Sequence, residues 1–260
     1  MSPPFQEVID RIAAVGYHNH RLEEHSDIVS TGIVKDLLQT CEPFRQDFES
    51  GVIGTWLNAR APGARGRKID LFIGEPQQGM AVPDISKLRI CVENKSVVTA
   101  HRNRTSRFDD LNDTMSVVHA MRKEAVIVAT VLVGIAPNVL NIPDQVKNRY
   151  RANIRKFEKS VVPRLSKGDE KLWKDFSWAI SVNRSNDPAN TVAKFRMLQT
   201  RRPGHTHVQG YDYVLLVPVY IDNVNPPRLA MDNNLGIDVE ADYKEMIDTI
   251  CKAYRARWHL

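Results

Sequence analysis

Apolar residues recur at helical spacing near both ends of the chain. In the first sixty residues three segments show it: FQEVIDRIAAVG, DIVSTGIVKDLLQTC with an N-cap at Ser26 and Asp27, and EPFRQDFESGVIGTWL with Pro43 at an early helical position. The segment VEADYKEMIDTICKAYRARW repeats this spacing at the C-terminal end. We therefore expect a helical N-terminal region, residues 1–60, and an amphipathic helix that closes the chain.

Between these helices the period changes to the value of two that is typical of strands. The stretches KIDLFIG and LRICVENK lie on either side of the Gly- and Pro-rich loop EPQQGMAVPD, which predicts an antiparallel strand pair. In the second stretch Leu88, Ile90 and Val92 fall on one face of the strand. Glu93 and Lys95 fall on the other face, as neighbours that point the same way.

A helix and two further strands follow in the pattern. The segment AHRNRTSRFDDLNDTMSVVHAMRK carries an apolar stripe that starts at Phe108 and becomes polar when extended back to His101. EAVIVATVLVGI is a near-continuous apolar run, as expected of a strand buried on both faces. The strand LRICVENK, this helix and this strand together predict a unit in which a helix connects two parallel strands. GYDYVLLVPVYID is another strand, and Pro218 indicates that its end lies at an edge of the sheet.

These elements predict an α/β protein with a mixed central sheet flanked by helices. The 260 residues fit one large domain. We divide it into a helical region over residues 1–60, a core over residues 61–140, a basic and mostly helical segment over residues 141–205, and a last region over residues 206–260 with the strand at the edge and the closing helix.

Charge is distributed unevenly along the chain. The net charge of the whole chain is +5, but residues 145–205 carry 15 Lys and Arg against 5 acids. Such a segment is either a solvated Lys-rich surface or a surface that binds phosphates. No apolar run approaches the roughly 18 residues of a membrane span and the N-terminus lacks a signal-peptide pattern, so we expect no membrane contact and a cytoplasmic location.

The cysteine pattern offers neither a disulfide framework nor a metal site. The chain has three cysteines, Cys41, Cys91 and Cys251, which are scattered and odd in number. We expect ordinary reduced thiols.

Two carboxylates and a lysine are the strongest candidates for chemistry. Pairing Asp70 with Glu93 also sets Ile73 against Ile90 and leaves the intervening residues as the loop. Like charges that close together normally require a cation. Oxygen ligands without Cys or clustered His favour Mg²⁺, with Mn²⁺ as a substitute, and the backbone carbonyl of Asn94 can add another oxygen. The alternative is a salt-bridge ladder on the surface of the sheet.

Asp70, Glu93 and Lys95 resemble the Asp...Glu-x-Lys signature of the PD-(D/E)XK nuclease superfamily, whose members share a restriction-endonuclease-like core. The resemblance extends over residues 42–135 and includes the order strand, strand, helix, strand. It implies metal binding by Asp70 and Glu93, assistance to the attacking water by Lys95, and a further acid from the preceding helix, for which we choose Glu49, with Glu42 as second choice. It also implies a type II enzyme that acts as a homodimer.

Two features of the sequence depart from the pattern, and one alternative ligand is rejected. Ile69 stands where the superfamily name has proline. The literal pair Pro83 and Asp84 lies too close to Glu93 to fold back as a paired strand, so we expect Asp84 to stabilise a turn. GVIGTWL is a poor candidate for the strand that the superfamily has before its first acid.

Basic residues follow the Glu-x-Lys strand at the start of the next helix. Arginine there is unfavourable to the helix dipole unless an anion is bound, and Arg and Asn can read base edges. The Gly- and Pro-rich loop RRPGHTHVQG is a second candidate, since recognition residues often lie on loops. Expected DNA contacts are His101, Arg102, Asn103, Arg104, Arg107, Arg201, Arg202 and His205. Each one alone is equally compatible with a solvated surface residue.

The sequence therefore predicts a Mg²⁺-dependent, sequence-specific endonuclease of double-stranded DNA, a restriction enzyme of type II. One alternative is a repair or recombination nuclease that selects DNA structure. The other is a DNA-binding protein without catalysis whose acidic cluster is structural.

Overall fold

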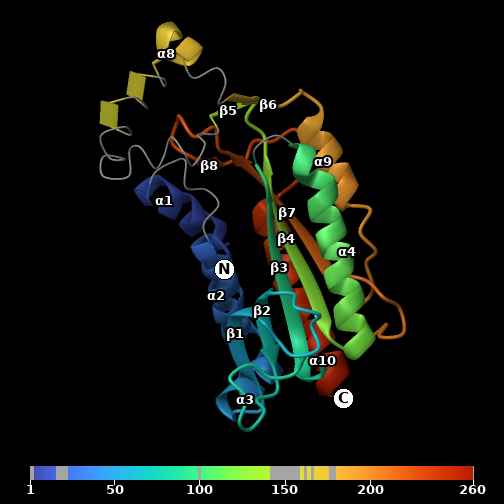
Figure 1. Ribbon diagram of the computed structural model, residues 1–260. Coiled ribbons are helices and arrows are strands. Elements are labelled where there is room, and N and C mark those ends of the chain that lie inside the picture. The colour runs from blue at the N-terminus through green and yellow to red at the C-terminus, as the bar shows by residue number, and fades with distance from the viewer. Residues whose placement is uncertain are drawn as a thin grey trace.

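A six-stranded mixed sheet forms the centre of the structure, a computed structural model (Figure 1). The strand order is β1-β2-β3-β4-β7-β8. The pairs β1/β2, β2/β3 and β7/β8 are antiparallel, whereas β3/β4 and β4/β7 are parallel. The strands are β1 (Gly54–Ala59), β2 (Ile69–Gly74), β3 (Leu88–Val97), β4 (Val126–Gly134), β7 (Tyr213–Tyr220) and β8 (Arg228–Leu229). The structure describes residues 3–15, 23–98, 101–140, 159–160, 163–164, 167–175 and 180–259.

Helices cover both faces of this sheet (Figure 1). One layer contains α1 (Phe5–Val15), α2 (Glu23–Thr40), α3 (Glu42–Glu49) and α10 (Val239–Trp258). The other layer contains α4 (Arg104–Met121), which follows the short 3-10 helix η3 (His101–Asn103), and α9 (Asp187–Phe195). The predicted α/β class with a mixed sheet is confirmed.

The predicted pairing of the two central strands is also confirmed. Ile73 lies opposite Ile90, and the ladder continues to Leu71 opposite Val92. The strand, helix, strand unit predicted after it is present as β3, α4 and β4, with β3 and β4 parallel. The C-terminal helix spans the predicted segment as α10.

The predicted third helix of the N-terminal region is wrong in its second half. α3 ends at Glu49, and Gly51 takes a left-handed φ of 74° that stops the helix. β1 then begins at Gly54, and the Trp56 ring packs edge-on against Phe72 of β2 at 5.7 Å between centroids. Residues 1–60 are therefore not all helical, and the segment GVIGTWL, which we considered a poor candidate for a strand, contains the start of β1.

The sheet edge was also misplaced. β8 pairs with Val219 and Tyr220, so the end of β7 is not at the edge of the sheet. The short pair β5 (Asn138–Leu140) and β6 (Ile180–Val182) forms a separate two-stranded sheet that the pattern did not predict. Much of the predicted basic segment 141–205 lies outside the described residues, and the rest of it includes β6, α9 and the short helix α8 (Glu170–Asp175).

Two of the three cysteines form a disulfide, which contradicts the expected reduced thiols. Cys41, between α2 and α3, is bonded to Cys251 of α10, with 5.5 Å between their Cα atoms. Cys91 is a free, buried thiol. Helix packing brings the bonded pair together over a separation of 210 residues, which spacing in the sequence could not indicate. No helix in the described residues is both long and apolar enough to span a membrane.

Candidate active site

The candidate site lies where β2 begins beside the middle of β3. At the start of β2, Leu71 lies opposite Val92 of β3. The same register sets the preceding residue, Asp70, opposite Glu93. β3 continues to Val97, with β4 alongside it throughout. In the described stretches of the chain no strand pairs with residues 94–97 on the other side. β3 therefore has an open edge immediately after Glu93.

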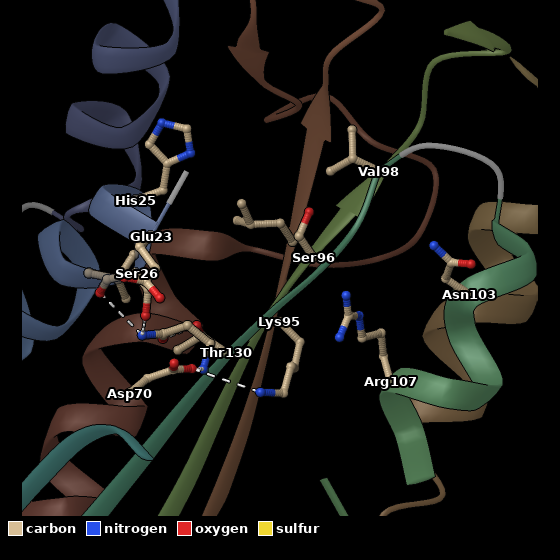
Figure 2. Close-up of a pocket in the computed structure, with 13 residues that line it drawn as sticks. Glu23, His25, Ser26, Asp70, Lys95, Ser96, Val98, Asn103, Arg107 and Thr130 are labelled. Carbon is tan, nitrogen blue, oxygen red and sulfur yellow. Dashed lines mark hydrogen bonds and ion pairs between the residues drawn. The ribbon is translucent and has the colours of Figure 1, made fainter. Parts of the chain in front are cut away.

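The three residues of the signature come together at this edge. The Lys95 Nζ lies 2.6 Å from Glu93 Oε2 and 3.9 Å from Asp70 Oδ2. Figure 2 shows the lysine side chain turned toward Asp70. The two carboxylates and the lysine thus lie together, as the strand pairing predicted, and the lysine is the cation between the carboxylates.

Burial makes these charges costly. Glu93 is only 1% exposed, and burial raises its pKa to about 7, although the Lys95 ammonium opposes this shift. Burial likewise raises the pKa of Asp70, against the effect of Lys95 and of a backbone hydrogen bond from Asn94. Burial alone would lower the pKa of Lys95, but the two carboxylates outweigh it and raise that pKa. The site therefore favours bound positive charge.

The oxygen atoms at the site fit a hard divalent cation. Glu93 Oε1 is buried and has no hydrogen-bond partner among the described residues. The Asn94 N–H donates to Asp70 Oδ2 at 2.7 Å. Because the N–H and C=O of a strand residue point to the same neighbour, the Asn94 carbonyl faces the same side. The described residues hold no group of three or more His, Cys, Asp or Glu suited to a metal, so any other ligands would be carbonyls or water.

A pocket of about 440 Å³ opens beside these residues, between α2 and α4. Glu23, His25 and Ser26 of α2 line one wall, and Asn103 and Arg107 line the other (Figure 2). Between the walls lie Asp70, the open edge of β3 and part of β4. The pocket is therefore a groove that gives access to Asp70 and Lys95 from the edge of the sheet, whereas Glu93 lies buried behind them and is not one of its lining residues.

Asn94 fixes one wall of the groove to the sheet. Its amide Nδ2 donates to Ser26 Oγ at 2.9 Å and to Ser30 Oγ at 3.0 Å, both on α2. Its Oδ1 accepts from Thr130 Oγ1 of β4 at 2.6 Å. The residue between the Glu and the Lys of the signature thus ties α2, β3 and β4 together at the level of the acids.

The two residues predicted as an additional acid on the preceding helix lie away from the groove. Glu49 and Glu42 are exposed on α3 and do not line the groove. On α2, Glu23 lines the groove, and the Asp27 carboxylate contributes to the raised pKa of Asp70. Glu23 and Asp27 lie near the start of α2, before most of its buried residues. The sequence does not indicate that this end of the helix lies near Asp70; only the packing of α2 on the sheet shows it.

Asp84 serves the turn before β3, as predicted. Its carboxylate accepts from the Ser86 N–H at 2.9 Å and caps the 3-10 helix η2 (Ile85–Lys87). It is not among the residues of the groove.

The expected DNA contacts lie in different surroundings. Asn103 and Arg107 line the groove, and Arg202 and His205 are exposed. Arg104 is engaged by Asp187 at 3.3 Å, and the side chain of Arg102 lies outside the described residues. The other two expected contacts are contradicted.

Arg201 and His101 are buried, so the structure contradicts their expected contact with DNA. The Arg201 guanidinium lies 3.1 Å from Asp212 in a fully buried pair. Its companion Arg257 binds the other oxygen of the same carboxylate at 2.5 Å. His101 Nδ1 lies 2.6 Å from Thr191 Oγ1 on α9. Both residues hold the fold together.

Comparison of the chain with protein-family models, with curated proteins and with solved structures finds no match.

Proposed function

We propose that this chain is a Mg²⁺-dependent endonuclease that cuts double-stranded DNA at specific sequences, with the PD-(D/E)XK type of site and the homodimeric organisation of a type II restriction enzyme. The observation that carries the proposal is the cluster of Asp70, Glu93 and Lys95 at the open edge of β3. An exposed salt-bridge ladder would not need a carboxylate that is 1% exposed and has an oxygen without a partner among the described residues.

The residues at the site divide the work of phosphodiester hydrolysis. Asp70, Glu93 and the Asn94 carbonyl would hold Mg²⁺ or Mn²⁺. When bound, the metal polarises a phosphoryl oxygen and lowers the pKa of a coordinated water. Lys95 keeps its proton at neutral pH because the carboxylates raise its pKa, so it can orient a water or stabilise a phosphate oxygen as negative charge develops. Arg107, which lines the groove and pairs with Asp110 at 3.2 Å, would bind the phosphate backbone.

Two alternative functions are compatible with the same residues. A structure-selective nuclease would use the same site, with a different DNA surface. A DNA-binding protein without catalysis would keep Lys95 closed on Glu93 as a structural ion pair, and their 2.6 Å contact is compatible with that role.

Incubation with plasmid and phage DNA in Mg²⁺ separates the three functions. Discrete fragments support a sequence-specific enzyme. Smears or nicks at DNA junctions indicate structure selection, and binding without cutting indicates a protein that only binds DNA.

The variant Lys95→Ala tests the role of the lysine. Loss of one group that stabilises the transition state slows cleavage by about 100-fold or more, while DNA binding stays close to wild type. Plasmid cleavage and DNA binding in Ca²⁺ are measured together with the unfolding midpoint. Lys252→Ala, an exposed lysine on α10, is the matched control and should cut normally. If folded Lys95→Ala cuts at the wild-type rate, the assignment is wrong.

A further inference from the structure

The loop between β1 and β2 is strongly basic and leads directly into the site. Residues 60–68, here called the basic loop, contain Arg60, Arg65, Arg67 and Lys68 and no acid. Asp70 follows two residues later. Four cations in nine residues repel one another, so acids of the fold or a bound anion would stabilise the loop.

The loop is held in a defined conformation. Ala61 and Ala64 are buried anchors, 6% and 1% exposed. The Ile85 N–H donates to the Pro62 carbonyl at 2.9 Å, which ties the loop to η2. Gly63 has a φ of 79°, and an added Cβ would lie 2.8 Å from Ile85 Cγ2. The backbone is therefore fixed against the rest of the fold.

Arg65 is exposed at a position that favours glycine. Its φ is 52°, and the following Gly66 is also left-handed at 76°. A side chain in this region costs roughly 1 kcal/mol relative to glycine, and such strain is often retained at functional positions. Arg60 is exposed as well. Among the described residues no acid forms an ion pair with either arginine.

The other two basic residues connect the loop to both walls of the groove. Arg67 binds Asp113 of α4 at 2.7 Å, and Lys68 pairs with Glu23 of α2. Burial raises the pKa of Glu93 and of Asp70, and the charges of Arg67 and Lys68, respectively, oppose that rise. Two of the four cations therefore brace the site, and the other two face solvent.

We propose that the basic loop binds the phosphates of duplex DNA that flank the bond to be cut, through Arg60 and Arg65. This inference rests on the proposed function. Planar guanidinium groups suit phosphate oxygens and can bind them in pairs. The fixed loop reduces the entropy lost on binding. The contact supplies affinity without reading sequence.

The double variant Arg60→Gln/Arg65→Gln tests the loop. Its binding to a duplex of arbitrary sequence is measured by fluorescence anisotropy in Ca²⁺, chosen to keep the DNA uncut, over a series of salt concentrations. The matched control is Lys252→Gln/Arg255→Gln, which removes the same charge from exposed positions of α10, on the opposite face of the sheet from α4 (Figure 1). Thermal unfolding establishes that all three proteins are folded.

We expect the loop variant to weaken binding roughly tenfold and to reduce the slope of log K against log salt by about 2, since each lost phosphate contact removes about one released counterion. The control should keep the wild-type slope. A loop variant with the wild-type slope, or an equal loss in both doubles, overturns the role of the loop alone. A wild-type chain that binds no duplex DNA overturns the proposed function as well.

Discussion

At the scale of single residues, the proposed metal binding depends most on the ionisation of Glu93. It is buried, one oxygen contacts Lys95, and the other has no partner among the described residues. A pKa raised to about 7 means that a proton and a metal compete for this carboxylate near neutral pH. The other proposed ligand, Asp70, accepts a hydrogen bond from the Asn94 N–H, which stabilises its charge.

We therefore expect Mg²⁺ affinity to depend on pH. The metal binds the ionised form, and below pH 7 a proton must leave Glu93 first, so the affinity falls by up to about tenfold for each pH unit below 7. Above pH 7 the carboxylate is already ionised and this dependence disappears. Calorimetric titration of the protein with Mg²⁺ across about 1.5 pH units on either side of that pKa measures it.

Two variants accompany this titration. Glu93→Gln should bind Mg²⁺ weakly and lose the pH dependence near neutrality. Glu49→Gln changes an exposed acid of α3 and should leave the Mg²⁺ affinity and its pH dependence unchanged. A dissociation constant that stays constant across the pH range, or a Glu93→Gln protein that binds as wild type, would contradict the assignment of Glu93 as a ligand.

At the scale of elements, local patterns predicted the site better than its surroundings. The register of β2 and β3 followed from apolar alternation, because only one pairing sets Ile73 against Ile90 and both inward. β1 was missed because its alternation is weak: Gly54 opens it, and its apolar contact, Trp56 on Phe72, is visible only after pairing. The acids of α2 were missed because helix periodicity does not say which end of a helix packs beside a given strand.

Asn94 connects these elements, and we expect its removal to loosen α2 from the sheet. Asn94→Ala loses hydrogen bonds to Ser26, Ser30 and Thr130 and leaves their hydroxyl groups without this partner. The free energy of unfolding should fall by about 2–3 kcal/mol, since each lost bond costs about 1 kcal/mol. Urea unfolding measures it.

Asn112→Ala on α4, where the side chain has no hydrogen bond in the described residues, is the control and should stay within about 0.5 kcal/mol of wild type. Equal stability of the two variants would mean that the hydrogen bonds of Asn94 do not hold α2 in place.

At the scale of the whole molecule, contacts between distant parts of the chain hold α10 against the N-terminal helices. Tyr254 of α10 donates to Asp47 of α3 at 2.6 Å, and Arg89 of β3 binds the same carboxylate at 2.7 Å. The Cys41–Cys251 disulfide joins the same regions. In each of these contacts the two residues are far apart in the sequence, so composition and periodicity could not indicate the contact.

Reduction of the disulfide should therefore lower the stability of the entire fold. A bond that closes a loop of this length restricts the unfolded chain and typically stabilises a protein by about 2–4 kcal/mol. We expect dithiothreitol to reduce the free energy of unfolding by about that amount in urea, and Cys251→Ser to show the reduced stability with or without it. Alkylation under denaturing conditions followed by mass spectrometry counts the thiols: one adduct, at Cys91, without reductant and three with it. Three adducts in the absence of reductant, from protein purified without it, would show that the pair is not bonded. That outcome would agree with the expected cytoplasmic location, where thiols are kept reduced.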